Sequence, residues 1–423
     1  MIRLDGKVSN VVGLVIEASL PDAAMGELCQ IHTKRGEIIR AEIVGFKGDK
    51  VLLMPLDQTV GIAPGSRVER SPTPLYVEVG PELLGRVIDG LGNPIDGKGP
   101  IFADKRQAVY NDPPNPLTRD RIHDILATGI RSIDGLVTIG RGQRVGIFAG
   151  SGVGKSVLLG MIARYTEAEV NVIALIGERG REVREFIERD LGSEGLKRSV
   201  VVVATSDQAA MVRVKGALIA TAISEYFRDQ GRDVMLLMDS LSRVAMAQRE
   251  IGLAVGEPPT TKGYTPSVFA LLPRLLERAG TAQRGSITGL YTVLVEGDDM
   301  DEPISDASRA ILDGHIVLSR RLATRGQYPA IDVNQSISRL RTEVVSDKQR
   351  DQSQAILEML ADYSDSEDMI NIGAYVAGSN PSVDKAIDKI DDIRNFLKQD
   401  MRDSAPFEDT MAKMNATLKG AKA

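Results

Sequence analysis

Residues 144–165 read RVGIFAGSGVGKSVLLGMIARY, and the order of the three parts of this stretch decides the fold. RVGIFA is an apolar run of strand length, GSGVG is a glycine-rich loop, and KSVLLGMIARY has the apolar spacing of a helix. Strand, loop and helix in this order are the context in which a glycine-rich loop binds phosphate. The backbone N–H groups of such a loop surround the phosphate, and the helix N-terminus adds its dipole.

The loop and the first helical residues supply the expected contacts to ATP and Mg²⁺. Lys155 is expected to reach the β- and γ-phosphate oxygens, and Ser156 to offer its hydroxyl to Mg²⁺. The predicted phosphate-binding residues are Gly150, Ser151, Gly152, Val153, Gly154, Lys155 and Ser156. Ala149 replaces the first glycine of the strict pattern, and alanine is small enough for the loop to form. The alternatives are a plain glycine-rich turn and a dinucleotide-binding loop, in whose fingerprint Lys155 and Ser156 have no part.

Three acidic residues follow apolar runs farther along the chain. DVMLLMD ends in Asp239, which places a carboxylate at the end of a buried strand, where it can hold the Mg²⁺ shell. VIALI leads into GERGRE, so Glu178 and Glu182 also lie just beyond a strand, where α/β sheets bind ligands. A carboxylate there can polarise the attacking water in phosphoryl transfer, or it can simply complement a helix dipole. The spacing alone is consistent with both.

The rest of the chain divides into three kinds of pattern. From residue 7 to 71, short β-rich runs separated by turn residues predict a small β-barrel. Turn-rich sequence between residues 72 and 120, including NDPPNPL, is typical of a linker and a domain boundary. From residue 142 onward, apolar strand-length runs alternate with helices, which indicates a parallel sheet covered on both faces. After residue 347 only helical spacing remains, and Asn380 followed by Pro381 is a helix start.

We therefore expect a multidomain protein with an N-terminal β-barrel at 1–75, a P-loop α/β domain at 76–346 and a C-terminal α-helical domain at 347–423. A length of 423 residues fits two or three domains. The net charge of −6 argues against wrapping nucleic acid through bulk positive charge. The single cysteine, Cys29, cannot form an internal disulfide, and neither a signal peptide nor a membrane span is predicted. These features favour a cytoplasmic protein.

Several long motifs resemble those of a known family. AGSGVGKS, GERGREV, MDSLSR and YPAIDVNQSISR occur in the order seen in the catalytic subunits of rotary ATP synthases and their relatives. SVFALLPRLLERAG, TVLVEGDDMDEP and ILDGHIVLSRRLA are similar to the export ATPases of type III secretion, and AMAQREIGLAVGEPPTTKGY is closer to the flagellar branch. The resemblance covers about residues 7–400 and implies that the central parallel sheet is RecA-like.

The resemblance also implies roles for the acidic loop. By it, Glu178 is the catalytic base, Glu182 and Asp239 shape the magnesium and water shell, and Arg179 belongs to the same loop. The sister subunit that binds nucleotide without catalysis lacks this glutamate, so the pair of Glu178 and Lys155 favours an active enzyme over a structural ring subunit.

Three residues farther along the chain are implied to complete the site. Arg339, in SISR, would reach the γ-phosphate bound by the neighbouring protomer, whereas without the resemblance an interface salt bridge is the plainer interpretation. Tyr328 of QYPAID would stack on adenine. Tyr375 of NIGAYVAG would form a second wall, although buried tyrosines usually serve packing alone.

The implied protein is a homohexameric Mg²⁺-dependent ATPase that energises protein export through the flagellar type III apparatus. The implied partners are an export regulator or stator, a central stalk protein, the membrane export gate and chaperone–substrate complexes, with no nucleic acid. Its expected location is cytoplasmic and peripheral at the inner-membrane export apparatus. The acidic run Glu296–Asp306 is implied to face the pore of the ring, where it would touch the stalk or the substrate, and is otherwise a solvated turn.

Two alternatives keep the same core fold. One is an injectisome export ATPase, and the other is an RNA translocase, against which the acidic balance of the chain argues. Flagellar members usually carry an N-terminal amphipathic helix that binds the regulator, whereas the β pattern here begins soon after Met1. Either the chain is shortened at this end or it docks its regulator differently.

Overall fold

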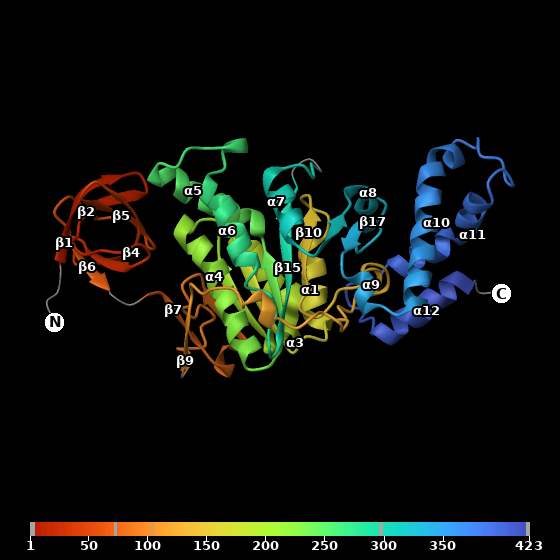
Figure 1. Cartoon of the computed structure of the whole chain (residues 1–423), viewed down its shortest axis with the longest axis horizontal. Coiled ribbons are helices and arrows are strands. Elements are labelled where there is room, and N and C mark those ends of the chain that lie inside the picture. The colour runs from red at the N-terminus through yellow and green to blue at the C-terminus, as the bar shows by residue number, and fades with distance from the viewer. Residues whose placement is uncertain (1–4, 72–73, 104, 296–298, 420–423) are drawn as a thin grey trace.

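The computed structural model of the chain describes residues 5–71, 74–103, 105–295 and 299–419. Three parts lie in a row along the longest axis: a β-barrel, a central α/β sheet and a group of helices (Figure 1). The predicted order of barrel, P-loop sheet and C-terminal helices is therefore confirmed. No helix in the described ranges is both long enough and apolar enough to cross a membrane.

The N-terminal part is a closed barrel with the strand order β1-β2-β5-β4-β3-β6. Its strands are β1 (Asp5–Val12), β2 (Val15–Ser19), β3 (Leu28–His32), β4 (Ile38–Lys47), β5 (Lys50–Pro55) and β6 (Arg67–Ser71). Alternate residues such as Cys29 and Ile31 of β3 point into an apolar core, because successive side chains of a strand face opposite sides.

The central part is a nine-stranded sheet with the order β17-β16-β10-β15-β13-β11-β12-β8, and β14 pairs with β15. Its strands are β8 (Arg86–Asp89), β10 (Arg144–Ala149), β11 (Val170–Ile176), β12 (Ser199–Ala204), β13 (Asp233–Asp239), β14 (Gly280–Thr281), β15 (Ser286–Leu294), β16 (Gly314–Leu318) and β17 (Ile331–Ser338). The strands from β16 to β8 run parallel, whereas β14 and the edge strand β17 are antiparallel to their neighbours.

Helices cover both faces of this sheet. The helices of the central part are α1 (Lys155–Tyr165), α2 (Gly180–Glu185), α3 (Gly192–Lys197), α4 (Ala210–Asp229), α5 (Leu241–Val255), α6 (Pro266–Leu276), α7 (Pro303–Ile311), α8 (Arg320–Thr324) and α9 (Arg341–Val344). Those of the C-terminal part are α10 (Asp347–Asn371), α11 (Pro381–Leu397) and α12 (Phe407–Lys419). Helices α4 to α7 pack on strand residues such as Val172 and Leu236, and α1 packs on their neighbours Ile173 and Leu237. Strands buried on both faces explain the continuous apolar runs of the sequence.

The C-terminal helices α10, α11 and α12 share an apolar cluster with α1. The predicted start of α11 is confirmed, since Asn380 caps the helix by accepting a hydrogen bond from the backbone N–H of Ser382. Ile393 of α11 and Met414 of α12 are fully buried in this cluster. The helical part is thus joined to the sheet by a continuous core.

The turn-rich segment between barrel and sheet is more than a linker. It contains β8, which pairs in parallel with β12 at the edge of the sheet, and the ribbon of β7 (Tyr76–Val79) and β9 (Lys105–Ala108). Short helical turns lie in this and other connections: Pro81–Leu83, Pro116–Thr118, Ile133–Val137, Phe186–Leu191 and Thr261–Gly263. Four-residue strands between glycine-rich turns leave too short a pattern to be read from sequence.

A buried polar contact ties the barrel to the sheet. Lys215 of α4 places its Nζ 2.5 Å from Oε2 of Glu42 on β4, and the Tyr110 hydroxyl donates to Oε1 of Glu42 at 2.8 Å. Lys215 is 1% exposed and Glu42 is 4% exposed. Burial raises the pKa of Glu42 and lowers that of Lys215, although each ion partly offsets the effect on the other.

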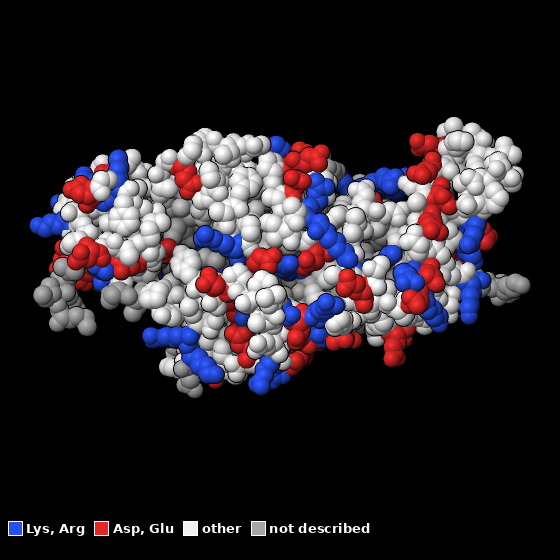
Figure 2. Space-filling view, viewed as in Figure 1, with Lys and Arg blue, Asp and Glu red and all other residues white. Residues whose placement is uncertain are grey.

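On the face of the molecule shown in Figure 2, Lys and Arg side chains are interspersed with Asp and Glu.

Candidate active site

The glycine-rich loop lies between β10 and α1, as the sequence predicts. Gly152 and Gly154 have φ angles of +77° and +89°, a left-handed conformation that glycine adopts without steric cost. Gly154 is the N-cap of α1 and has no side chain to offer to the helix. The N–H groups of the first turn are therefore available to a phosphate, which the helix dipole also attracts.

A pocket of about 750 Å³ opens above this loop. Its lining includes most of the predicted loop residues together with the residues that follow β11. The lining residues are Ala149, Gly150, Ser151, Gly152, Gly154, Lys155, Ser156, Val157, Gly177, Glu178, Arg179, Glu182, Arg189, Ser206, Arg243, Leu294, Val295 and Arg320. Val153 is buried beneath the loop and does not line the pocket.

Lys155 lies between two carboxylates at the floor of this site. Its Nζ is 2.5 Å from Oδ1 of Asp239 and 3.3 Å from Oε1 of Glu178. Burial alone would lower the pKa of Lys155, but the charges of Asp239 and Glu178 outweigh it and raise the pKa. The lysine is therefore held as a cation at the point where the loop would place phosphate oxygens.

Asp239 is fixed by its strand and by a hydrogen bond. It is the last residue of β13, its side chain is 4% exposed, and the Thr292 hydroxyl of β15 donates to Oδ1 at 2.7 Å. With the hydroxyl of Ser156 at the start of α1, it offers the oxygen ligands that Mg²⁺ prefers. No group of three or more His, Cys, Asp or Glu residues arranged to hold a metal occurs in the described parts of the chain. A site with few protein ligands suits Mg²⁺, which is usually held together with substrate phosphates.

Glu178 and Glu182 have opposite pKa shifts. Burial, together with the nearby charge of Asp239, raises the pKa of Glu178 to about 7. The pKa of Glu182 is lowered, chiefly because it accepts a hydrogen bond from Glu178 and also because Arg179 lies nearby. Arg179 itself is exposed and donates to Glu182 at 3.3 Å. A carboxylate with a pKa near 7 can accept a proton from water at neutral pH.

Sequence reasoning assigned no role to three arginines that line the pocket: Arg189, Arg243 and Arg320. Arg243 lies in the first turn of α5, four residues after Asp239, and its buried Nε has no hydrogen-bond partner among the described residues. Gly177 leaves room for it, because a Cβ at Gly177 would lie 2.8 Å from Cβ of Arg243. The MDSLSR motif could have indicated this arginine, because its spacing puts Arg243 in the first turn of α5, about one helical turn after Asp239.

A second pocket of about 290 Å³ adjoins the loop at Gly154 and Val157. Tyr328 lines it with Pro329, Leu158 and Met161, and a Cβ on Gly154 would lie 3.5 Å from two ring carbons of Tyr328. The main chain of Tyr328 is anchored where its carbonyl accepts the backbone N–H of Gln399 at 2.9 Å. An apolar slot with a half-exposed aromatic ring beside the phosphate loop is suited to a planar base.

Tyr375 is not brought to either pocket. It lies between α10 and α11, where its hydroxyl is 3.0 Å from both the carbonyl of Asn380 and Oδ1 of Asp384. Within one chain it therefore stabilises the turn before α11 and does not form a wall opposite Tyr328.

Arg339 is also separated from the pocket of its own chain. Ser338 pairs with Gly314, at the start of β16, while the loop follows Ala149, which pairs with Leu318 at the end of β16. The two sites thus lie at opposite ends of neighbouring strands, roughly 13 Å apart along β16 at about 3.3 Å per residue. The side chain of Arg339 is exposed, and its Nη2 donates to the carbonyl of Arg309 at 2.9 Å.

The acidic run before α7 is described only in part, since Glu296 and the two residues after it lie outside the described ranges. Asp299 accepts a hydrogen bond from Lys262 at 3.2 Å, and Glu302 caps α7 by accepting from the N–H groups of Ile304 and Ser305. Asp301 is almost fully exposed. Asp301 also pairs with Arg309 at 3.5 Å, so the described part of the run is held by local contacts while the Asp301 carboxylate stays accessible from outside.

Comparison with protein families gives three matches that together span most of the chain. The nucleotide-binding domain of the ATP synthase alpha/beta family matches residues 129–338, and the β-barrel domain of that family matches residues 8–72. The T3SS EscN ATPase C-terminal domain matches residues 345–416.

Individual proteins are similar over nearly the whole length. The flagellum-specific ATP synthase of Bacillus subtilis is 56% identical over 413 residues, which cover 97% of this chain and 94% of that protein. The type 3 secretion system ATPase of Xanthomonas euvesicatoria is 51% identical over 410 residues, with 97% and 93% covered. The assembled ATPase EscN from the enteropathogenic E. coli type III secretion system has a TM-score of 0.93 at 44% identity, covering 98% of this chain and 100% of that chain. EscN in complex with its central stalk EscO gives a TM-score of 0.91 at 43% identity, with 98% and 100% covered.

Proposed function

Because the chain belongs to the ATP synthase alpha/beta family and, within it, to the ATPases of flagellar and type III secretion systems, we propose that it works as a homohexameric, Mg²⁺-dependent ATPase of flagellar protein export. The resemblance drawn from the sequence motifs is thereby confirmed, and the chain is an ATPase that energises type III export. The observation that carries the catalytic proposal is the placement of Glu178 beside Lys155, 3.3 Å apart at the floor of the pocket.

The residues of the pocket divide the reaction between them. The loop N–H groups and Lys155 bind the β- and γ-phosphates, and Tyr328 stacks on adenine. Glu178 accepts a proton from water while the water oxygen bonds to the γ-phosphorus and the bond to the bridging oxygen of ADP breaks. Ser156 and Asp239 would hold Mg²⁺, which would supply neutralisation of the charge on the phosphates. Glu182 and Arg179 orient the water shell around Glu178.

The ring follows from the position of Arg339. Since its own loop lies at the opposite end of the strands, Arg339 can reach a γ-phosphate only on a neighbouring chain, where a guanidinium stabilises the transferring phosphoryl group. A head-to-tail contact of this kind closes into a ring when the rotation between neighbours closes. Similarity over the whole chain to an ATPase solved in its assembled form supports this arrangement.

For the wider setting, we infer a central stalk protein as a partner, because a relative has been solved with its central stalk. The exposed acidic run around Asp301 is the proposed contact. The export regulator, the membrane gate and chaperone–substrate complexes remain proposed partners, as does a cytoplasmic location peripheral to the inner membrane. We propose domain boundaries at 75/76, between the matches to residues 8–72 and 129–338, and at 346/347, two residues inside the match that begins at residue 345. An injectisome role is the alternative, favoured by the similarity to type 3 secretion ATPases.

Glu178→Gln tests the catalytic proposal. We expect nucleotide affinity near that of the unmodified protein and turnover lowered by about 10²-fold or more, because the amide cannot accept the proton. Glu182→Gln is the matched control and should retain more turnover, since Glu182 acts through Glu178. The base assignment fails if Glu178→Gln retains more than about a tenth of the kcat.

A further inference from the structure

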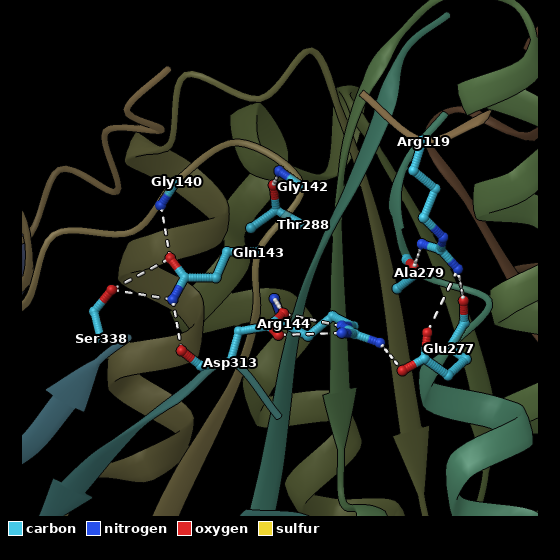
Figure 3. Close-up of polar contacts among 10 residues, drawn as sticks. All are labelled: Arg119, Gly140, Gly142, Gln143, Arg144, Glu277, Ala279, Thr288, Asp313 and Ser338. Atoms are coloured by element: carbon cyan, nitrogen blue, oxygen red, sulfur yellow. Dashed lines mark hydrogen bonds and ion pairs between the residues drawn. The ribbon is translucent and has the colours of Figure 1, made fainter. Parts of the chain in front are cut away.

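Gln143 makes an unusual set of contacts for a residue outside the pocket. It directly precedes β10 and is fully buried, yet its side-chain amide joins three separate segments (Figure 3). Oε1 accepts the N–H of Gly140 at 2.8 Å, while Nε2 donates to the carbonyl of Asp313 and to the hydroxyl of Ser338, each at 3.0 Å. Both N–H hydrogens of the amide are thus used on the segments that flank β16 and end β17.

Both of these acceptors adjoin Arg339. The Asp313 carbonyl that accepts from Gln143 also accepts the backbone N–H of Arg339 at 2.9 Å, and Ser338 is the residue before Arg339. Gly314 allows the close approach, because a Cβ there would lie 2.5 Å from the carbonyl oxygen of Ile337. The single amide therefore fixes the end of an edge strand at the point where Arg339 leaves the sheet.

Asp313 is itself held firmly. Its carboxylate accepts from the backbone N–H, Nε and Nη2 of Arg144 at 3.0 to 3.1 Å, and its N–H donates to the carbonyl of Arg144 at 2.8 Å. Arg144 also contacts Glu277 at 2.5 Å, so the network reaches the end of α6 (Figure 3). The main chain at Arg339 is thus anchored to the first residues of β10, while the guanidinium remains exposed.

From this geometry we propose that Gln143 is a positioning residue for Arg339, so that it serves the active site of the neighbouring chain and not that of its own. The inference rests on the proposed trans action of Arg339. A rival interpretation is available, because β10 leads from Gln143 into the phosphate loop. The two interpretations place the defect of a Gln143 variant in different halves of the composite site.

Gln143→Met removes the hydrogen bonds and keeps a side chain of similar length. We expect kcat to fall about 10- to 100-fold, because a displacement of about an ångström can cost this much. KM for ATP should stay within about twofold, since Lys155 and the loop are unchanged.

Rings assembled from two variants show which half of the composite site a variant damages, the pocket of one chain or the Arg339 of its neighbour. Gln143→Met chains keep the pocket and lack a positioned Arg339, whereas Glu178→Gln chains keep Arg339 and lack the base. Equal mixing leaves about a quarter of head-to-tail interfaces complete, so turnover should rise several-fold above either variant alone. Mixing Gln143→Met with Arg339→Ala should give no rise in turnover, because both variants lack a correctly positioned Arg339.

Three results of these mixing experiments would contradict the proposal. A rise with Arg339→Ala and none with Glu178→Gln would place Gln143 in its own pocket and overturn the proposal. No rise with either partner, while Arg339→Ala and Glu178→Gln rescue each other, would reduce Gln143 to general stability and also overturn it. If those last two fail to rescue each other although labelled chains exchange, trans action itself is refuted, and the proposal falls with it.

Thr288→Val is the matched control. The buried Thr288 hydroxyl accepts the N–H of Gly142 at 2.8 Å, so this variant loosens the same loop without touching β17 (Figure 3). Its kcat should stay within about twofold of the unmodified protein. Should Gln143→Met fail to fold, Ser338→Ala removes one of the same bonds and should show the same rescue pattern with a smaller loss.

Discussion

The phosphate pocket and the Arg339 edge differ in how complete each is within one chain. In the pocket, Lys155, Glu178 and Asp239 are already in contact and mostly buried, with side chains 13%, 16% and 4% exposed. At the edge, a buried network fixes the main chain at Arg339, while its exposed guanidinium donates to the carbonyl of Arg309. In the proposed mechanism, one chain supplies nucleotide binding and proton transfer, and a second copy supplies the stabilisation of the phosphoryl group.

The largest effect on turnover is expected from removing the guanidinium of Arg339. Arg339→Ala should lower kcat by about 10³-fold or more, because an arginine finger contributes on this scale, and should leave ATP affinity nearly unchanged. Steady-state kinetics with nucleotide titration measure both. Arg341→Ala is the control from the same segment, since Arg341 donates to the carbonyl of Leu136 in its own chain. Equal losses for the two variants would contradict the special role of Arg339.

The next effect comes from breaking the pocket. Lys155→Ala should weaken ATP binding by about 10²-fold, because the lysine contacts phosphates in the ground state as well as in the reaction. Titration with a fluorescent nucleotide measures the change. Exposed Lys197, which pairs with Glu194 on the surface, provides the control Lys197→Ala. If Lys155→Ala left the affinity for ATP unchanged, Lys155 would not be a phosphate-binding residue. The contrast with Arg339 would then be lost.

The pH dependence of kcat/KM sharpens the comparison, because Glu178 of the pocket has a pKa near neutrality. With a Glu178 pKa of about 7, kcat/KM should fall as pH drops through 7, by about tenfold for each further unit, since the protonated base cannot accept a proton. Glu182→Gln should move this acidic limb to lower pH, because the hydrogen bond to Glu182 helps to raise the pKa of Glu178. An acidic limb that stays in place in Glu178→Gln would assign it to another group.

The smallest effect concerns the adenine slot. Tyr328→Ala should raise KM for ATP about 3- to 10-fold, the scale of one lost aromatic stack. Tyr375→Ala should leave KM unchanged, because its hydroxyl is engaged with Asp384 away from both pockets. If Tyr375→Ala raised KM as much as Tyr328→Ala, the ring would bring Tyr375 to a nucleotide after all.

The predictable parts of the fold are those with a strong local pattern. Continuous apolar runs form five of the strands, β10, β11, β12, β13 and β15, because both faces of the sheet are covered. This pattern predicts each of them as a strand. β8 has four residues between glycine-rich turns, and β17 carries polar residues such as Asn334 and Gln335 because it is an edge strand. Neither pattern distinguishes a strand from a loop.

The sequence alone determined the loop chemistry, since the residues that bind phosphate are contiguous from 150 to 156 and their geometry is local. It also identified Asp239 and Glu178 as strand-end acids. Only the tertiary structure decided that Lys155 bridges them, that Tyr375 lies away from Tyr328, and that Arg339 lies at the opposite end of the strands from its own loop. The physical reason is that these relations depend on strand order and register, which bring together segments separated by up to 200 residues, and no local pattern encodes that order.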